Sequence, residues 1–310
     1  MIMQELIDFF AARPEAATRV SQIVVNTGFT GVLLENGQAG MAMNIRSAGR
    51  PAQADLDFLQ EVIGRPALDL ASRSLGYGRL ALSAGLAALS ALSQPYLDQS
   101  FLGPHNLKVD RVDTGRFPDH GITPGSRVGM VGFGGGAWRM AGLAGQLVVT
   151  ELEPELFRSR IISREGVVEG PTRFRLAPAA ESPYLLAGCD TVLITGCALV
   201  SRTIDELLAT CRNSRVVIYG PSASLLPLPF FRHPQVAAIT TIRVLDGTKL
   251  MNLLANAGPG VERLLAEASE SLYIRRLEPA GTITPADPPS GVTACGNAET
   301  GASESITPSA

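Results

Sequence analysis

The sequence Arg127-Val-Gly-Met-Val-Gly-Phe-Gly-Gly-Gly-Ala137 decides the fold of the larger part of this chain. Its opening apolar run, residues 128–132, is typical of a strand that is buried on both faces. The glycines that follow are typical of a tight strand-to-helix turn, in which backbone N–H groups can approach an anion. The stretch therefore predicts the first strand and the first turn of a doubly wound α/β domain.

Similar apolar runs return later in the chain, and helical patterns lie between most of them. Continuous apolar strands that alternate with helices are typical of a parallel sheet covered on both faces. We therefore predict a doubly wound α/β domain over residues 122–278. Its further strands are expected over residues 147–150, 191–195, 216–219 and 236–241, and its helices over 204–211, 248–256 and 260–274.

Residues 1–115 show a different arrangement, in which strands come before most of the helices. After a helix over residues 3–12, strands are expected over 21–26, 32–35 and 41–45, and helices over 54–63 and 77–92. Asn36-Gly37 is a strong tight-turn signal between two of these strands. The pattern predicts a smaller α+β domain. Residues 279–310 are rich in Gly, Pro, Ser, Thr and Ala and predict a disordered tail.

Composition and charge narrow the class of protein. Hydrophobic residues make up 45% of the 310 residues and charged residues 18%, which excludes a chain that is disordered throughout. A net charge of −3 indicates no basic surface for nucleic acid or an anionic membrane. The longest apolar run, residues 80–92, is too short to span a bilayer. The cysteines form no CxxC pair and the N-terminus is acidic, so we expect a cytoplasmic protein with free thiols.

Turns that carry glycines and hydroxyls follow several predicted strands, and they form the candidate binding site. Because the carboxyl ends of parallel strands meet at one edge of a sheet, these turns should converge. Glu151 ends the second predicted strand about twenty residues after Gly132, where an acid could meet a ribose hydroxyl. The predicted cofactor-binding residues are Gly132, Gly134, Gly135, Gly136, Glu151, Thr195, Gly196, Gly220 and Ser222.

The glycine turn leaves two interpretations open. The motif GxGxxG finds Gly132 and Gly134, while Ala137 stands at the third glycine position, which the motif allows. One interpretation is a nucleotide or phosphate site, and the other is a tight turn in a domain that binds no nucleotide. Thr203 is expected to cap the helix over residues 204–211.

His105 and Cys197 are the candidate metal ligands. The histidines are far apart in the sequence and none is paired at i, i+4, so no metal motif is present. His105 could serve as an acid, a base or a ligand, or be a solvated loop residue. Cys197 could be a soft ligand or a nucleophile, or a small residue packed under the strand ends.

Several stretches of the chain resemble a family known as putative heavy-metal chelation, whose function is unknown. They are residues 127–132, 190–208 and 216–227 in the second part and residues 85–92 in the first. The resemblance implies an N-terminal domain like that of enolase, followed by a Rossmann-like domain. It also implies a site in the cleft between the two domains, with a proposed role in binding or chelating metal.

This sequence departs from the family pattern at three positions. Ser90 and Ser201 replace the amide or acid that the family usually carries, and Ala81 replaces an acid. Each change removes an oxygen ligand, whereas the run Gly134-Gly-Gly136 favours an anionic ligand.

Three functional hypotheses follow. The first is a binding protein whose interdomain cleft holds a small anionic molecule or a metal complex, with a metal ion or an anionic small molecule as the cofactor. The second is an NAD- or S-adenosylmethionine-dependent enzyme, and the third is an interaction module with a vestigial site. No catalytic-triad order appears, so catalytic residues are not assigned and catalysis stays open. The sequence also leaves homo-oligomerisation open.

Overall fold

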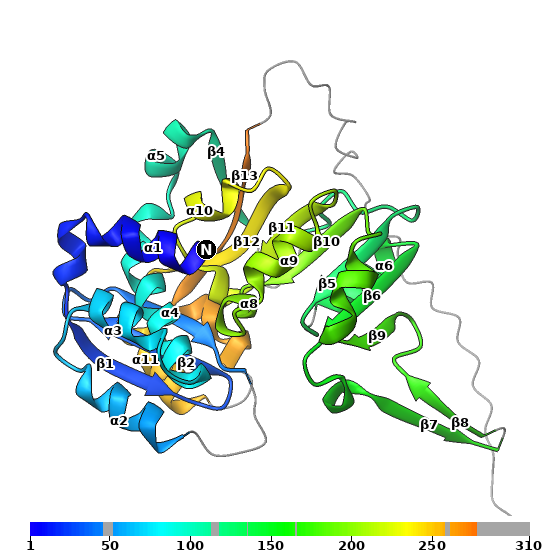
Figure 1. The fold of residues 1–310 in the computed structure, drawn as a ribbon, viewed down its shortest axis with the longest axis horizontal. Coiled ribbons are helices and arrows are strands. Elements are labelled where there is room, and N and C mark those ends of the chain that lie inside the picture. The colour runs from blue at the N-terminus through cyan, green and yellow to red at the C-terminus, as the bar shows by residue number, and fades with distance from the viewer. Residues whose placement is uncertain (46–51, 113–117, 135, 165, 258–260, 278–310) are drawn as a thin grey trace, which may run out of the picture. The chain divides into compact units, whose positions relative to one another are not determined.

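The predicted apolar strands form the centre of an eight-stranded sheet in the computed structural model of this chain (Figure 1). The structure describes residues 1–45, 52–112, 118–134, 136–164, 166–257 and 261–277. In spatial order the strands are β4 (Leu107–Val112), β13 (Ser269–Arg276), β12 (Val236–Val244), β11 (Arg215–Tyr219), β10 (Thr191–Thr195), β5 (Arg127–Val131), β6 (Gln146–Glu151) and β9 (Arg175–Pro178).

The strands from β12 to β9 are parallel, and β13 and β4 add two antiparallel strands at one edge. If the six parallel strands are numbered by their order in the chain, they read 3-2-1-4-5-6 across the sheet from β9 to β12. The direction of winding therefore reverses between β5 and β10, where open α/β sheets bind their ligands. This large, mostly parallel sheet, with the smaller antiparallel sheet described below, confirms the predicted mixed α/β fold class.

Both faces of the parallel sheet are buried, as the apolar runs predicted. Along β10, Val192 and Ile194 pack into one hydrophobic cluster, while Leu193 between them packs into another on the opposite face. The helices that accompany the parallel strands are α6 (Gly136–Leu143), α7 (Ser182–Leu186), α8 (Cys197–Val200), α9 (Ile204–Thr210), α10 (Leu228–Phe231) and α11 (Gly247–Asn256).

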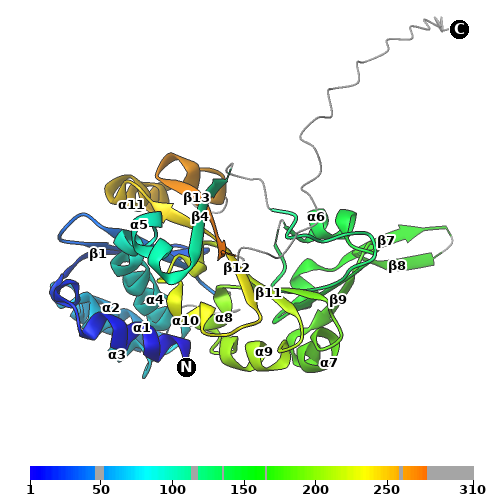
Figure 2. The ribbon, with the colours of Figure 1, turned by 90° about the horizontal axis from the view of Figure 1, so that it is seen from above.

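The smaller sheet is an antiparallel meander of β1 (Val20–Val25), β2 (Phe29–Leu34) and β3 (Ala39–Met43). Gly37 makes the predicted turn between β2 and β3 with a φ of 84°. One face packs against α4 (Arg79–Ser93), and Figure 2 shows α11 on the opposite face. Glycines allow both helices to come close, because a Cβ on Gly40 would meet the α4 backbone and one on Gly31 would meet Leu254.

The meander and helix α11 of the parallel-sheet part share a hydrophobic core. The apolar side chains of α11, among them Leu250 and Leu254, share a cluster with Phe29 and Met41 of the meander. Residues Met1–Leu277 accordingly form one compact unit. The predicted tail over residues 279–310 lies outside the described residues.

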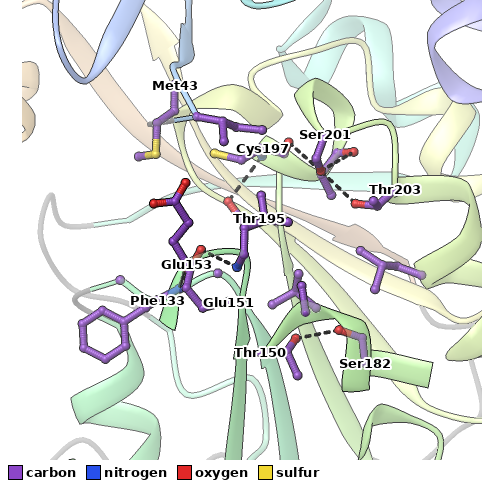
Figure 3. Close-up of a pocket in the computed structure, with 18 of the residues that line it drawn as sticks. Met43, Phe133, Thr150, Glu151, Glu153, Ser182, Thr195, Cys197, Ser201 and Thr203 are labelled. Atoms are coloured by element: carbon purple, nitrogen blue, oxygen red, sulfur yellow. Dashed lines mark hydrogen bonds between the residues drawn. The ribbon is translucent and has the colours of Figure 1, made fainter. Parts of the chain in front are cut away.

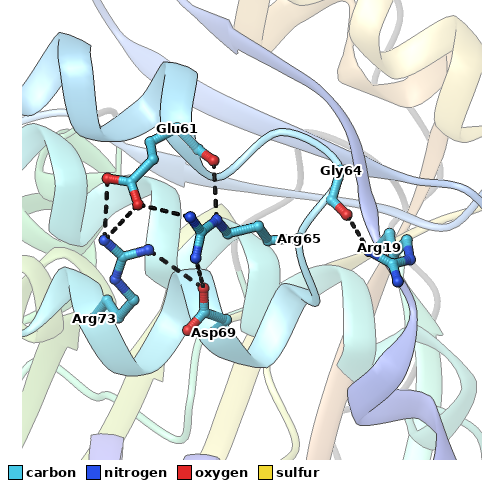
Figure 4. A network of polar contacts seen from close by, with 6 residues as sticks. All are labelled: Arg19, Glu61, Gly64, Arg65, Asp69 and Arg73. Carbon is cyan, nitrogen blue, oxygen red and sulfur yellow. Dashed lines mark hydrogen bonds and ion pairs between the residues drawn. The ribbon is translucent and has the colours of Figure 1, made fainter.

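The remaining helices of the first part are α1 (Ile2–Ala11), α2 (Gln53–Glu61), α3 (Ala67–Ser74) and α5 (Gln99–Leu102). Figure 4 shows a surface network that joins α2 to α3. Glu61 forms ion pairs with Arg65 at 2.9 Å and with Arg73 at 3.0 Å, and Arg73 also pairs with Asp69. Ion pairs this exposed contribute little to the stability of the fold.

The predicted helix over residues 260–274 is wrong. Its described residues form two short 3₁₀ turns, Val261–Arg263 and Leu265–Glu267, followed by strand β13. In β13 the buried residues Leu272 and Ile274 alternate with more exposed ones, and the strand pairs with both β12 and β4. Pairing on two sides outweighs the local preference for a helix.

Along the chain, a two-stranded hairpin of β7 (Ser159–Ser163) and β8 (Gly166–Gly170) follows β6 and precedes β9. The sequence did not predict this hairpin. Its aliphatic side chains are exposed, as at Ile162 with 77% of its surface accessible.

In the described part of the chain no single helix has the length and apolarity to cross a membrane, although the pair Arg79–Tyr96 and Gln99–His105, bent by 81°, would meet those criteria together.

Candidate functional site

A pocket of about 340 Å³ opens at the carboxyl ends of β5, β6 and β10, at the reversal of the sheet (Figure 3). Gly132, Gly134, Glu151, Thr195 and Cys197 line it, so five of the predicted site residues lie together. The meander and the segment after it close the pocket with Gly28, Met43, Asn44 and Ile45.

The glycine turn is fixed by its neighbours. Gly132 has a φ of 87°, and a Cβ there would lie 2.9 Å from the Thr195 side chain. The buried Tyr219 hydroxyl lies 2.8 Å from the Gly132 carbonyl oxygen and 3.0 Å from that of Val131. Burial raises the pKa of Tyr219 well above its usual value, so the hydroxyl keeps its proton and donates to this turn.

Glu151 turns back onto the same loop. Its carboxylate accepts hydrogen bonds of 2.7 Å from the backbone N–H groups of Phe133 and Leu152, one on each oxygen. The N–H of Phe133, which the glycine pattern offered to an anionic ligand, is therefore bonded to an anion of the protein itself. A second anion at this position would face a like charge.

The described lining of the pocket is acidic. Glu151, Glu153 and Glu206 line it, and no lysine, arginine or histidine does so among the residues that the structure describes. This charge disfavours the small anionic ligand that the glycine run led us to expect. The expectation of an anionic ligand differed from the structure because the sequence could not show that the Glu151 carboxylate is bonded to the glycine turn.

Cys197 lines the pocket as a neutral thiol. Burial is the main cause that raises its pKa above the usual value. Its sulfur lies 3.8 Å from the hydroxyl of Ser222, and its backbone N–H donates to Thr195 Oγ1 at 3.3 Å. A protonated thiol is a poor nucleophile and a poor metal ligand, so the packed-residue interpretation of Cys197 gains support.

Gly196, Gly220 and Ser222 support the pocket without being among its lining residues. A Cβ on Gly196 would lie 2.5 Å from the backbone nitrogen of Ala223, and Gly220 has a φ of 98°. Ser222 Oγ accepts from the backbone N–H of Met43 at 2.8 Å, which joins the meander to the turn after β11. These residues hold the two walls of the pocket together.

Thr203 does not cap α9, which corrects the prediction. It stands at the N-cap position, but its hydroxyl pairs with that of Ser201 at 2.8 Å, and both residues line the pocket (Figure 3). Between them Arg202 has a φ of 61°, and its guanidinium donates to the Leu75 carbonyl oxygen at 2.7 Å. This bond holds the loop in a conformation that a residue with a side chain rarely adopts.

The candidate metal ligands are not brought together. His105 is exposed in the 3₁₀ turn Gly103–His105, packs beside the ring of Phe101 and is not among the lining residues. Within the described ranges no group of three or more His, Cys, Asp or Glu side chains is placed to hold a metal ion. Gly136 begins α6 and does not line the pocket, and Gly135 lies outside the described residues.

Several lining residues carried no signal that the sequence analysis used. Thr150 and Ser182 form a buried hydrogen bond of 2.9 Å at the pocket wall. The rings of Phe133 and Phe157 stack with centroids 4.7 Å apart. Phe133 lies inside the glycine turn itself, so a search for strand-end residues of every type would have included it.

Comparisons with known proteins agree with the fold. Residues 7–93 and residues 118–264 match two family models that share the description "Putative heavy-metal chelation". None of the curated proteins matches the sequence.

Two solved structures of proteins of unknown function, from the family that residues 118–264 match, resemble this chain. The one from Desulfitobacterium hafniense DCB-2 is 20% identical with a TM-score of 0.64, and the one from Pyrococcus horikoshii is 16% identical with a TM-score of 0.62. Each similarity covers 88% of this chain and 98% of the other. At this identity the likeness concerns the fold alone.

Proposed function

This chain belongs to the family described as "Putative heavy-metal chelation", and from that premise we propose that it binds a small molecule or a metal complex in the pocket at the reversal of its sheet. The observation that carries the proposal is the pocket itself. Its size is that of a small-ligand site, and glycine turns, hydroxyls and carboxylates from separate strands converge on it.

The side chains favour a metal that arrives within a complex over a bare ion. A preformed metal site needs several ligating side chains around one point, and the described residues offer no such group. The walls are largely apolar, with Met43, Ile45, Leu156 and Phe157 among them. Such walls suit the organic part of a ligand, while the carboxylates favour positive charge.

A pocket-filling variant tests this function. Gly134 lines the pocket and a Cβ there would meet nothing within 4 Å, so the indole of Gly134→Trp should occupy the pocket. Gly142 of α6 also has open space around it and is not a lining residue, so Gly142→Trp is the matched control. We expect a thermal-shift screen of metabolites, divalent metal ions and their citrate and histidine complexes to find a compound that stabilises the wild type and Gly142→Trp but not Gly134→Trp.

The expected effect is large enough to measure. A ligand at 100 times its Kd adds about 2.7 kcal/mol to the free energy of unfolding. If a compound stabilises Gly134→Trp as much as the wild type, it binds outside this pocket and contradicts the proposed site. A flat response across the screen, together with native mass spectra that show no bound compound, would remove the proposal.

One observation favours a second function, an NAD- or S-adenosylmethionine-dependent enzyme. Glu151 stands at the end of the second parallel strand, where dinucleotide-binding domains carry the acid that binds ribose. The same pocket offers Cys197 only as a protonated thiol, and no described histidine or lysine lines it. Proton transfer would fall to carboxylates such as Glu151, which already accepts from two backbone N–H groups. Binding without catalysis is therefore the function that we place first.

A further inference from the structure

We propose that the ligand of this pocket is a nucleoside with a positively charged substituent, of the adenosyl-sulfonium class to which S-adenosylmethionine belongs. This inference rests on the proposed function and names the ligand class of the same site. It combines the position of Glu151, its unused acceptor sites, the charge of the lining and the stacked rings at the wall.

Glu151 is held in an orientation that leaves both carboxylate oxygens able to bind a diol. Phe133 N–H and Leu152 N–H each occupy one oxygen at 2.7 Å. A carboxylate has about four acceptor sites, so roughly two remain, one on each oxygen. The two hydroxyls of a ribose match that arrangement, and the backbone bonds remove the cost of ordering the acceptor.

The charge of the pocket separates two kinds of nucleoside. NAD and ATP bring phosphate groups to a glycine turn whose Phe133 N–H is already taken by Glu151. No described lysine, arginine or histidine lines the pocket to offset those phosphates, whereas Glu153 and Glu206 add negative charge. A sulfonium ion gains from the same field that repels a pyrophosphate.

The wall next to Glu151 suits a base and a cation. Leu152, Leu156 and Phe157 follow directly after β6 and line the pocket, and Phe157 stacks on Phe133. Apolar side chains beside the ribose acid give a purine a surface to pack on. A ring face that the stacked partner leaves uncovered also attracts a cation within about 6 Å.

Isothermal titration calorimetry of the full chain tests the inference. We expect S-adenosylmethionine to bind at least about five-fold more tightly than its neutral analogue S-adenosylhomocysteine, which is about 1 kcal/mol. NAD and ATP should bind at least about ten-fold more weakly than S-adenosylmethionine. Equal or tighter binding of NAD or ATP would overturn the inference.

Substitutions of single acids locate the effect. Glu151→Gln should weaken S-adenosylmethionine binding about ten-fold or more, the value of one charge-assisted hydrogen bond. Glu206→Gln should weaken it by about two-fold to five-fold through charge alone, since no hydrogen bond holds its side chain in the described structure. Glu155→Gln is the control, because Glu155 is exposed, pairs with Arg158 and does not line the pocket.

The outcomes distinguish this inference from the proposed function. Binding of another compound, blocked by Gly134→Trp, with no binding of any nucleoside would defeat the inference and leave the function standing. Tight S-adenosylmethionine binding that Glu151→Gln and Glu206→Gln both leave unchanged would also defeat it. If no compound binds in the pocket, both proposals fail.

Discussion

The carboxylate of Glu151 and the backbone N–H of Phe133 are joined by a hydrogen bond of 2.7 Å that closes the glycine turn from within the protein. The two partners are 18 positions apart along the chain. Phe133 follows strand β5, and Glu151 is the last residue of strand β6. The glycine turn was the predicted anion site, and Glu151 was the predicted ribose ligand. In the structure the Glu151 carboxylate itself occupies an N–H group of that turn. The contact places a negative charge beside the turn, which favours a positively charged ligand over an anion there.

The contact should also contribute to stability. In Glu151→Gln the side-chain oxygen can serve Phe133 or Leu152 but not both, so one N–H loses its acceptor. We expect the free energy of unfolding to fall by about 1–2 kcal/mol in urea denaturation. Glu155→Gln should change it by less than about 0.5 kcal/mol. Equal stability of the two variants would show that the turn does not depend on the carboxylate.

Two glycines of the same turn should respond differently to alanine. Gly132 has a φ of 87°, and its Cβ would press on Thr195, whereas Gly134 has open space and no such φ. We expect Gly132→Ala to lower the free energy of unfolding by about 1–2 kcal/mol or more. Gly134→Ala should stay within about 0.5 kcal/mol of the wild type. The opposite ranking in chemical denaturation would contradict the geometry of the turn.

Packing of α4 on the meander should make Gly40 intolerant of any side chain. A Cβ there would meet the backbone of Ala87 and Ala91, which cannot rotate away. Gly40→Ala should lower the free energy of unfolding by about 3 kcal/mol or prevent folding. Gly142→Ala in α6 meets nothing within 4 Å and should raise it by up to about 1 kcal/mol. Circular dichroism melts of both variants give the comparison.

Stability should fall in acid because of His120. Burial lowers the pKa of His120 from its ordinary value of 6.5 to about 4. Between those values the unfolded chain takes up a proton that the folded chain refuses, so the free energy of unfolding decreases as the pH falls from 6.5 to 4, by at most about 1.4 kcal/mol per pH unit. His120→Asn suits the φ of 53° and should flatten this slope. An unchanged slope would exclude His120 as its source.

The parallel core could be predicted from the sequence because each of its strands is a short apolar run that is recognisable from its own residues. Residues 128–132 and 191–195 are short apolar runs bounded by turn residues, and they became β5 and β10 within a residue. The convergence of Gly132, Glu151 and Thr195 followed from the topology, since parallel strands end at one edge.

The misses depend on distant parts of the chain. The helix predicted over residues 260–274 is wrong because β13 is stabilised by its pairing with β12 and β4, which its own residues do not reveal. Thr203 has the residue type of a helix cap, but its hydroxyl found a nearer partner in Ser201. The hydrogen bonds of Glu151 could not be predicted either, because the spacing of residues in a sequence does not determine the orientation of a carboxylate.

The helix α11 has a consequence for how this protein is made. Phe29 and Met41 of the meander are covered by Leu250, Met251 and Leu254, which the ribosome adds about two hundred residues later. Until then a nascent chain presents an uncovered apolar surface, the kind that chaperones recognise and that promotes aggregation. A nonsense mutation anywhere before residue 247 would leave that surface permanently bare, so truncated products should be cleared by proteolysis and not persist as a working N-terminal half.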